Sequence, residues 1–229
     1  MIRHLLCRIP LIVMLGCAEN LENPILTSTI AAPDNYQVEF ENDYLRIIRV
    51  RYSPGESSAM HSHEPFVGVT LTGTEGSVFT YADGSSETRS PSKPGSLIDG
   101  NLVPHSIVSG GSFDQDSIFI ELKKPYPTEE ATIPNLVDAA SGLASVELEK
   151  PGLRVVRIKN IGKGDTPLHS HRAGVSVPLT DINVEVTLPS GEVRQVYKPA
   201  GEVAWEEPRA HKGKNLSDEP NEMILFELM

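Results

Sequence analysis

Histidines are the residues whose spacing points most directly to chemistry. Six of the seven histidines form two triplets of the same layout, in which an HxH pair is followed about forty residues later by a third histidine. The first triplet is His61, His63 and His105, and the second is His169, His171 and His211. Side chains at positions i and i+2 of a strand project from one face, so each pair can aim two imidazoles at one point.

Three imidazoles suit a divalent transition metal. Three protein ligands that leave coordination positions open are typical of catalytic sites rather than of closed structural sites. We therefore predict one divalent transition metal for each triplet, and imidazole ligands alone do not distinguish among Fe, Zn, Cu, Mn and Ni. The alternative is that both triplets are hydrogen-bonded core histidines that were copied by one duplication.

The triplets belong to a longer internal repeat. Two segments recur at an offset of 108 residues, namely 45–50 as 153–158 and 60–63 as 168–171. Three later features recur at an offset of 106 residues, namely Gly95 as Gly201, His105 as His211 and 118–122 as 224–228. The sequence therefore indicates an internal duplication, in which one structural unit occurs twice.

Each copy consists of short alternating or β-branched runs separated by turn residues, which is typical of antiparallel β structure. In the first copy we expect strands at 45–52, 66–71, 77–81 and 117–122. In the second copy we expect them at 153–158, 175–179, 183–188, 193–197 and 223–228. Only residues 134–143, between the copies, favour a helical turn or two. The fold class predicted from these patterns is all-β, with two small barrels or sandwiches.

The alternation also predicts which side chains share a face with the histidines. If each strand runs on without a bulge, that face is apolar, and it continues as Pro65, Val67, Val69 and Leu71 in one copy and as Ala173, Val175, Val177 and Leu179 in the other. The opposite face carries polar or small residues such as Thr70 and Ser176, and we expect it to meet solvent or a partner sheet. Each metal is thus expected at one end of a mostly hydrophobic pocket.

The motifs around the histidines resemble those of the cupin superfamily. In the first copy they are Gly55…His61-Ser62-His63 and Pro94-Gly95…Pro104-His105. In the second copy they are Gly162/Gly164…His169-Ser170-His171 and Pro199-Ala200-Gly201…Pro208…His211. The resemblance implies two double-stranded β-helix (jelly-roll) barrels in tandem, a bicupin, over residues 36–123 and 145–229 with a connector at 124–144. It also implies that the six histidines are the metal ligands.

One departure from the family pattern bears on function. Many cupins have a carboxylate about four residues after the second histidine, where this chain has Val67 and Val175. A site of three histidines without a carboxylate resembles those of thiol dioxygenases and of bicupin dioxygenases that cleave aromatic rings or diketones, which use Fe(II), more than those of oxalate-processing or seed-storage bicupins. The resemblance implies a metal-dependent oxygenase, lyase or isomerase acting on a small organic acid or phenolic compound. Two alternatives stay open: a non-catalytic protein that binds a metal or small ligand, and a structural bicupin with vestigial sites.

Two glutamates occupy the same place on the last strand of each copy. Glu121 and Glu227 could orient a ligand histidine from outside the coordination sphere. We favour the simpler interpretation, an ion pair with the arginines that recur at 46, 49, 154 and 157, because all these positions repeat together. Trp205, near His211, is expected to be a packing residue rather than a platform for substrate.

The N-terminus has the layout of a bacterial lipoprotein signal. Two arginines precede the apolar run 9–15, which is too short to cross a bilayer, and Gly16 and Cys17 follow it. The resemblance implies a signal peptide over residues 1–16, lipid attachment at Cys17 and an extended tether over residues 17–35. The expected location is the cell envelope, as a periplasmic or outer-surface lipoprotein held to the membrane by its lipid anchor only.

The charge balance limits the partners. Lys and Arg number 20 against 31 Asp and Glu, a net charge of −11, and the chain has no basic stripe. Nucleic acid is therefore not an expected partner, because binding it requires clustered positive charge. We expect a small-molecule ligand, and an exposed sheet edge would also allow a homodimer.

Overall fold

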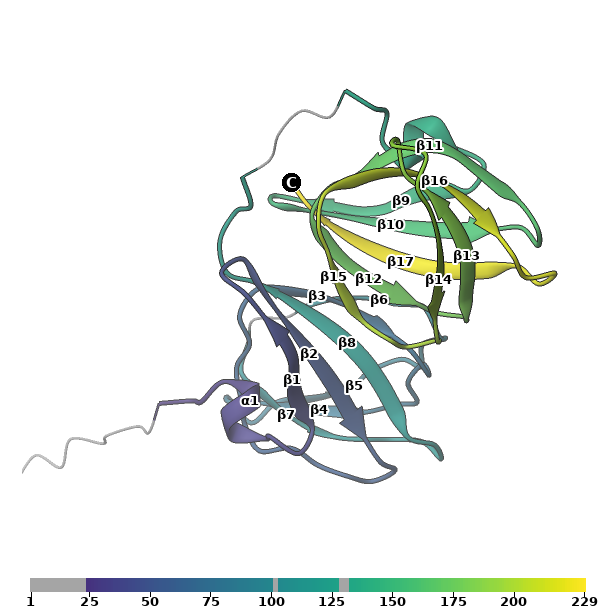
Figure 1. Cartoon of the computed structure of the whole chain (residues 1–229). Coiled ribbons are helices and arrows are strands. Elements are labelled where there is room, and N and C mark those ends of the chain that lie inside the picture. The colour runs from purple at the N-terminus through teal and green to yellow at the C-terminus, as the bar shows by residue number, and fades with distance from the viewer. Residues whose placement is uncertain (1–23, 101–102, 128–131) are drawn as a thin grey trace, which may run out of the picture.

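The structure is a computed structural model that describes residues 24–100, 103–127 and 132–229 (Figure 1). The first barrel consists of α1 (Ser28–Ala31), β1 (Tyr36–Glu41), β2 (Leu45–Tyr52), β3 (Phe66–Thr70), β4 (Val78–Tyr81), β5 (Ser86–Thr88), β6 (Leu97–Asp99), β7 (His105–Val108) and β8 (Gln115–Leu122). The predicted signal peptide over residues 1–16 and the predicted lipid attachment at Cys17 lie outside the described residues.

The second barrel repeats this order with one additional strand, β11, which carries its HxH pair. It consists of α2 (Leu136–Ala139), β9 (Ala144–Lys150), β10 (Leu153–Asn160), β11 (Asp165–His171), β12 (Gly174–Pro178), β13 (Ile182–Thr187), β14 (Val193–Lys198), β15 (Ala204–Glu206), β16 (Arg209–Asn215) and β17 (Asn221–Leu228). Among the described residues no helix has the length and apolarity needed to cross a membrane.

Each barrel is made of two antiparallel sheets. In the first barrel the strand orders are β1-β2-β8-β3-β6 and β5-β4-β7, and in the second they are β15-β12-β17-β10-β9 and β11-β16-β13-β14. The central pairs keep one register, because Leu45 lies opposite Leu122 on β2 and β8 while Leu153 lies opposite Leu228 on β10 and β17. The prediction of an all-β fold with two tandem jelly-roll barrels is confirmed.

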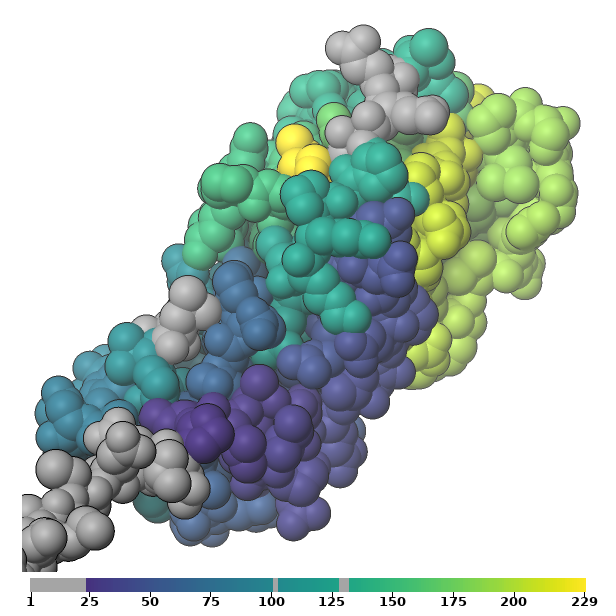
Figure 2. All heavy atoms as spheres, turned by 90° about the vertical axis from the view of Figure 1, so that its left-hand side faces the viewer, coloured from purple at the N-terminus to yellow at the C-terminus, as the bar shows by residue number. Residues whose placement is uncertain are grey.

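The largest apolar cluster lies between the barrels rather than inside either one. It joins residues of β2, β3 and β8 to residues of β10, β12 and β17, and it includes Ile47, Ile120, Val155 and Phe226. These strands are buried on both faces, since Ile47 faces the other barrel while its neighbour Ile48 belongs to the cluster inside the first barrel. Figure 2 shows the purple-to-blue and green-to-yellow halves meeting along a broad contact.

Two arginines complete this contact in a reciprocal way. Arg49 donates from Nη1 to the Gly201 carbonyl of the second barrel at 2.8 Å, and Arg157 donates from Nη2 to the Gly95 carbonyl of the first at 2.5 Å. Arg49 and Arg157 are repeat counterparts, as are Gly95 and Gly201. The barrels therefore meet through equivalent surfaces, as subunits do in a two-fold symmetric dimer.

The predicted face alternation is wrong. Val67, Val69, Val175 and Val177 belong to the cluster between the barrels, whereas Phe66, Thr70 and Ser176 line the barrel interiors. The prediction assumed that the strands run on from the histidines. However, β3 begins only at Phe66, and β11 ends at His171, in a different sheet from β12. The chain turns a corner between the sheets there, and the turn resets the alternation.

The last part of the predicted tether is folded onto the first barrel. Thr27 forms a parallel bridge with Ser62, α1 follows at Ser28–Ala31, and Asn35 is buried. The second barrel repeats this arrangement, with a bridge between Asn135 and Ser170 followed by α2. The repeated unit therefore starts before residue 36, and the described residues from Thr27 onward are not an extended tether.

Candidate metal centres

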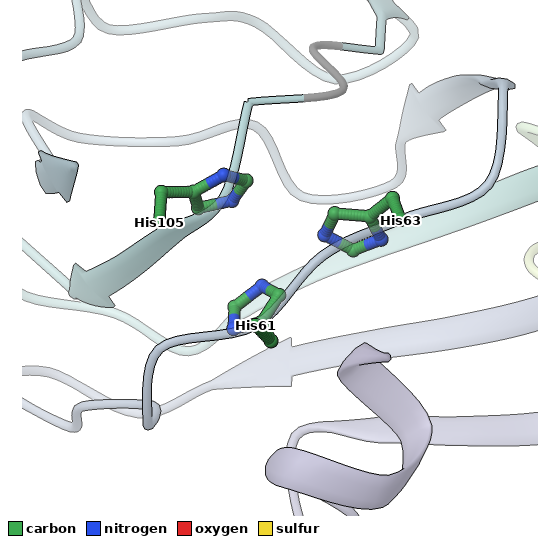
Figure 3. A group of neighbouring side chains, drawn as sticks. All are labelled: His61, His63 and His105. Atoms are coloured by element: carbon green, nitrogen blue, oxygen red, sulfur yellow. The ribbon is translucent and has the colours of Figure 1, made fainter. Parts of the chain in front are cut away.

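The first histidine triad is assembled by a backbone bridge between distant segments. His61 and His63 lie on the segment that leads into β3, and His105 is the first residue of β7. The amide of His61 donates to the His105 carbonyl at 2.9 Å, and the amide of His105 donates back to the His61 carbonyl at 3.0 Å. Figure 3 shows the three rings turned toward one another. All three residues are buried, and one nitrogen from each lies within 4.8 Å of the other two.

The second triad has the same construction on regular strands. His169 and His171 lie on β11, and His169 is paired with His211 on the neighbouring strand β16. One nitrogen from each ring again lies within 4.8 Å of the others, and the Nε2 atoms of His169 and His171 are 2.8 Å apart. The structure thus brings together all six histidines singled out from the sequence, three in each barrel.

Backbone carbonyls orient three of the rings. The Nδ1 atom of His61 lies 2.7 Å from the carbonyl of Ala59, and that of His105 lies 2.8 Å from the carbonyl of Val103. His169 repeats the contact with the Pro167 carbonyl at 2.7 Å. A carbonyl only accepts hydrogen bonds, so Nδ1 carries the proton and Nε2 keeps its lone pair for the centre of the triad.

One nitrogen of the first triad has no hydrogen-bond partner among the described residues, and this favours a metal site. Nε2 of His61 is buried, and no hydrogen-bond partner for it exists among the described residues. A buried nitrogen acceptor without a partner is costly, and a cation at the centre of the triad would satisfy it. The donor set therefore fits a transition metal that accepts neutral imidazole ligands.

The repeated glutamates form the expected ion pairs with arginines, and each also lies near a triad ring. Glu121 accepts from Arg46 Nε at 2.8 Å through Oε2, while its Oε1 lies 3.6 Å from Nδ1 of His63. In the second barrel Glu227 accepts from Arg154 Nε at 2.9 Å, and its Oε1 lies 3.8 Å from Nδ1 of His171. Each glutamate therefore pairs with an arginine and lies beside a triad ring without a hydrogen bond to it.

The predicted pairing of the arginines is only partly right. Arg46 and Arg154 contact the repeated glutamates, as the preferred interpretation requires. Arg49 instead pairs with Asp116, and Arg157 pairs with Glu147 and Glu222.

Burial raises the pKa of the Glu121 carboxyl, but His63 and Arg46 outweigh this and hold the pKa below its usual value. Glu121 is therefore a carboxylate at neutral pH.

Burial lowers the pKa of four of the triad rings. It lowers the pKa of His61 and of His169 to about 4 and that of His211 to about 3, with the neighbouring imidazoles adding to the effect. The pKa of His105 is also lowered, mainly by burial. These rings therefore present lone pairs rather than protons at neutral pH, which is the form that binds metals.

The space beside the first triad is walled by aromatic rings. The Tyr36 ring lies 4.8 Å from the ring of His61, and the Phe79 ring lies 4.9 Å from that of His105. Phe66 and Phe119 stack at 4.2 Å with an interplanar angle of 17°. All four aromatic residues line a cavity of about 330 Å³.

The cavity beside the second triad has a largely apolar wall that carries one charged group. Ser176 donates to Oε1 of Glu206 at 2.6 Å, and Lys198 donates to the Ser176 hydroxyl at 3.0 Å while forming an ion pair with Glu206. Arg209 pairs with the other oxygen of Glu206 at 2.7 Å. These four residues and the three histidines line a cavity of about 240 Å³. The sequence does not reveal this group, because no member repeats and the predicted alternation places Ser176 on the opposite face.

Glycines explain why the two interiors differ. A Cβ atom on Gly68 would lie 2.6 Å from the ring of Phe119, and one on Gly100 would lie 2.5 Å from the ring of Phe66. The stacked pair therefore requires glycine at both positions.

At the same four positions the second barrel has smaller residues in place of the two phenylalanines and larger residues in place of the two glycines. The repeat offsets place Gly174 and Leu225 where the first barrel has Phe66 and Phe119. They place Ser176 and Glu206 where the first barrel has Gly68 and Gly100.

Trp205 packs outside both cavities. Its ring stacks on Phe40 of the first barrel at 6.0 Å, at the contact between the barrels. Its indole donates to Glu207 at 2.6 Å. The prediction that Trp205 is a packing residue is confirmed.

Comparison with known proteins identifies the fold. No protein-family model matches the chain, and no curated protein sequence matches it either. The crystal structure of AerE from Microcystis aeruginosa is similar, with 17% identity, 85% of this chain and 91% of AerE covered, and a TM-score of 0.59. The structure of oxalate decarboxylase from Bacillus subtilis at pH 4.6 is similar as well, with 13% identity, 81% of this chain and 68% of that chain covered, and a TM-score of 0.54.

A cupin domain from Bordetella pertussis matches at 20% identity over 44% of this chain and 99% of that domain, with a TM-score of 0.36. All three identities are too low to carry a function across. Together with the strand order and the two matching halves, the similarities to AerE and to oxalate decarboxylase show that this chain has the cupin fold, in two tandem barrels.

Proposed function

We propose that each barrel binds one divalent transition-metal ion, the first through His61, His63 and His105 and the second through His169, His171 and His211. The observation that carries this proposal is the convergence of three imidazole nitrogens within 4.8 Å in both barrels. The backbone carbonyls that fix Nδ1 of three rings support it, because a ring protonated at Nδ1 has its lone pair on Nε2.

The identity of the metal is a separate question. Fe, Zn, Cu, Mn and Ni all accept imidazole ligands. Bacillus subtilis oxalate decarboxylase, which is similar in fold with a TM-score of 0.53, has been described for its Mn(II) centres, so Mn belongs among the metals to test. A bound divalent ion would supply Lewis-acid or electron-transfer chemistry at the positions that the histidines leave open.

We propose the first barrel as the site of an oxygenase-like reaction on a phenolic compound. The Phe66–Phe119 stack and the rings of Tyr36 and Phe79 offer flat apolar surfaces on which an aromatic ring can pack. Thr70 lines the same cavity and adds a hydroxyl to the apolar wall. These residues would bind and orient the substrate and exclude water from the triad.

The titratable groups of this cavity favour the alternative, a barrel that binds a ligand without turnover. Burial raises the pKa of Tyr36 well above its ordinary value and that of Tyr52 to about 12, so both stay neutral phenols. Arg89 is paired with Glu87, and Asp99 is paired with Lys150. The groups other than histidine that could move a proton are therefore neutral or already paired.

Metal analysis of the purified protein tests the proposal. We expect about two metal ions for each chain after reconstitution, and about one in either His61→Ala or His169→Ala, because each substitution removes one ligand of three. Unchanged metal content in both variants would contradict the assignment. Oxygen consumption with catechol after loading with Fe(II) then separates an enzyme from a binding protein, because only an enzyme consumes oxygen in a way that His61→Ala abolishes.

We also propose that the chain is a cell-envelope lipoprotein anchored at Cys17, which rests on the pattern of residues 1–17 alone. Labelling with radioactive palmitate in the producing bacterium tests this. The wild-type chain should carry label and sediment with membranes, while Cys17→Ser should do neither. An unlabelled wild-type chain would contradict the anchor.

A further inference from the structure

The cavity of the second barrel carries more positive than negative charge on its wall. Among the described residues that line it, the charged side chains are Arg194, Lys198, Glu206 and Arg209. Arg194 is exposed and paired with Glu192 outside the cavity. Lys198 and Arg209 then share the single carboxylate of Glu206, one on each oxygen. One unit of positive charge is therefore left without a counter-charge.

Lys198 is held where it can bind a ligand. Its side chain is 17% exposed, and it contacts Ser176 and Glu206 inside the barrel. An ammonium group has three N–H donors, and these two contacts use two of them. The third donor remains for a ligand, and a partly buried cation binds an anion more strongly than an exposed one does, because water screens it less.

The first barrel lacks every part of this arrangement. The repeat offsets place Gly68, Ser92 and Gly100 where the second barrel has Ser176, Lys198 and Glu206. Thr74 and Ser92 form an isolated bridge in the first barrel, as Ile182 and Lys198 pair in the second, which confirms that Ser92 and Lys198 are structural counterparts. The charged group is therefore specific to one barrel and is not a requirement of the fold.

We propose that the second barrel binds a small organic carboxylate, with Lys198 as the residue that recognises its negative charge and Glu206 as the carboxylate that competes with the ligand for Lys198. The cavity of about 240 Å³ suits a small acid, since a cavity of about 150 Å³ already accommodates a benzene ring. The proposal deepens the proposed function. It rests on that function at one point, because the metal of the second triad would take the ligand's second oxygen. Recognition of charge by Lys198 does not require that metal.

Calorimetric titration with pyruvate tests the proposal, and pyruvamide serves as the uncharged ligand of the same shape. The titrations use His61→Ala/His105→Ala protein, which keeps only the second triad intact, with and without added metal. We expect pyruvate to bind at least about tenfold more tightly than pyruvamide in both forms, because a charge-assisted hydrogen bond is lost with the amide. Metal content measured on the same samples reports separately on the proposed function.

Three further substitutions in this background separate recognition from structural support. Lys198→Met should weaken pyruvate binding about tenfold. Glu206→Gln should strengthen it several-fold, because the competing carboxylate is gone. Lys212→Met, an exposed lysine on β16, should leave it unchanged.

If Lys198 and Glu206 only supported the structure, Lys198→Met and Glu206→Gln would both weaken pyruvate binding. Opposite changes in pyruvate affinity therefore distinguish recognition from structural support. Lys198→Arg keeps the charge and should retain binding, which covers the case in which Lys198→Met fails to fold. Equal binding of pyruvate and pyruvamide, or weaker pyruvate binding in Glu206→Gln, would overturn the proposal.

Discussion

In the first barrel the triad shares its cavity with stacked aromatic rings, whereas in the second it shares its cavity with a lysine, a glutamate and a serine in mutual contact. The histidines, the arginine–glutamate pairs behind them and the strand register are the same in both barrels. The cavity walls differ. Duplication has kept the part that can hold an ion and has changed the part that can select a ligand.

The exchange between bulky and small residues shows how this change is accommodated. The first barrel combines Phe66 and Phe119 with Gly68 and Gly100, and a side chain at either glycine would collide with a ring. Removing the rings, as in the second barrel, makes room for Ser176 and Glu206. Neither set can be changed one residue at a time without a clash or a void.

Acid should destabilise both barrels of the metal-free protein strongly. His61 and His169 have pKa values of about 4, below the ordinary value near 6.5, so the folded state resists protons that the unfolded chain accepts. This stability is fully present above about pH 6.5 and is lost as the pH falls toward 4. We expect the free energy of unfolding, measured with urea, to fall by several kcal/mol over that range.

Replacing all six triad histidines with glutamine should remove most of this pH dependence. Saturating metal should also shift the loss of stability to lower pH, because bound metal excludes protons from the rings. Identical pH profiles for the wild type and the glutamine variant would rule out the triads as its source.

Breaking either arginine–glutamate pair should cost about the same in both barrels. Glu121 and Glu227 are almost fully buried, so Arg46→Met or Arg154→Met leaves a buried carboxylate without its cation. We expect a loss of about 3–5 kcal/mol for each variant in urea unfolding. The control is Lys123→Met, which breaks an exposed pair with Glu41 and should cost less than about 1 kcal/mol. A large loss in one barrel alone would show that the pairs are not equivalent.

Gly68→Ala tests whether the aromatic wall requires glycine. The new Cβ would lie 2.6 Å from the ring of Phe119, and overpacking of this kind costs about 1–3 kcal/mol. Adding Phe119→Leu, the residue type of the second barrel at this position, should recover part of the loss. A double variant no more stable than Gly68→Ala, in the same thermal or urea unfolding assay, would argue against the ring contact as the cause.

Substitution by alanine should destabilise the protein slightly more at Gly95 than at Gly201, the two glycines at the contact between the barrels. Gly95 and Gly201 both have positive φ, 79° and 77°, so alanine is strained at each by about 1 kcal/mol. At Gly95 the new Cβ would also lie 2.9 Å from Leu179, against 3.4 Å from Leu71 at Gly201. Gly95→Ala should therefore lower the thermal midpoint more than Gly201→Ala, and the reverse order would contradict the asymmetry.

Much of the fold could be predicted because it depends on local alternation. The strands at 45–52, 66–71 and 223–228 were expected within about two residues of their observed ends, since each has a period of two and clear turn residues nearby. The triads could be predicted because the same spacing occurs twice. The short helix α1 was missed, although Ala31-Ala32 recurs as Ala139-Ala140 at the same offset of 108.

The cavity walls could not be predicted from local pattern. The corner between each HxH pair and the next strand resets the alternation, so valines assigned to the interior lie between the barrels instead. The contact of Lys198 and Glu206 with Ser176 joins three strands, and no spacing rule connects them. Such contacts follow from sheet packing, which the sequence does not display residue by residue.

Anomalous diffraction from crystals of metal-loaded protein, recorded at the absorption edge of the bound metal, tests the central claim most directly. The account predicts one anomalous peak in each barrel, about 2.0–2.2 Å from a nitrogen of all three triad histidines. A strong peak elsewhere, or peaks in neither barrel after loading, would contradict it.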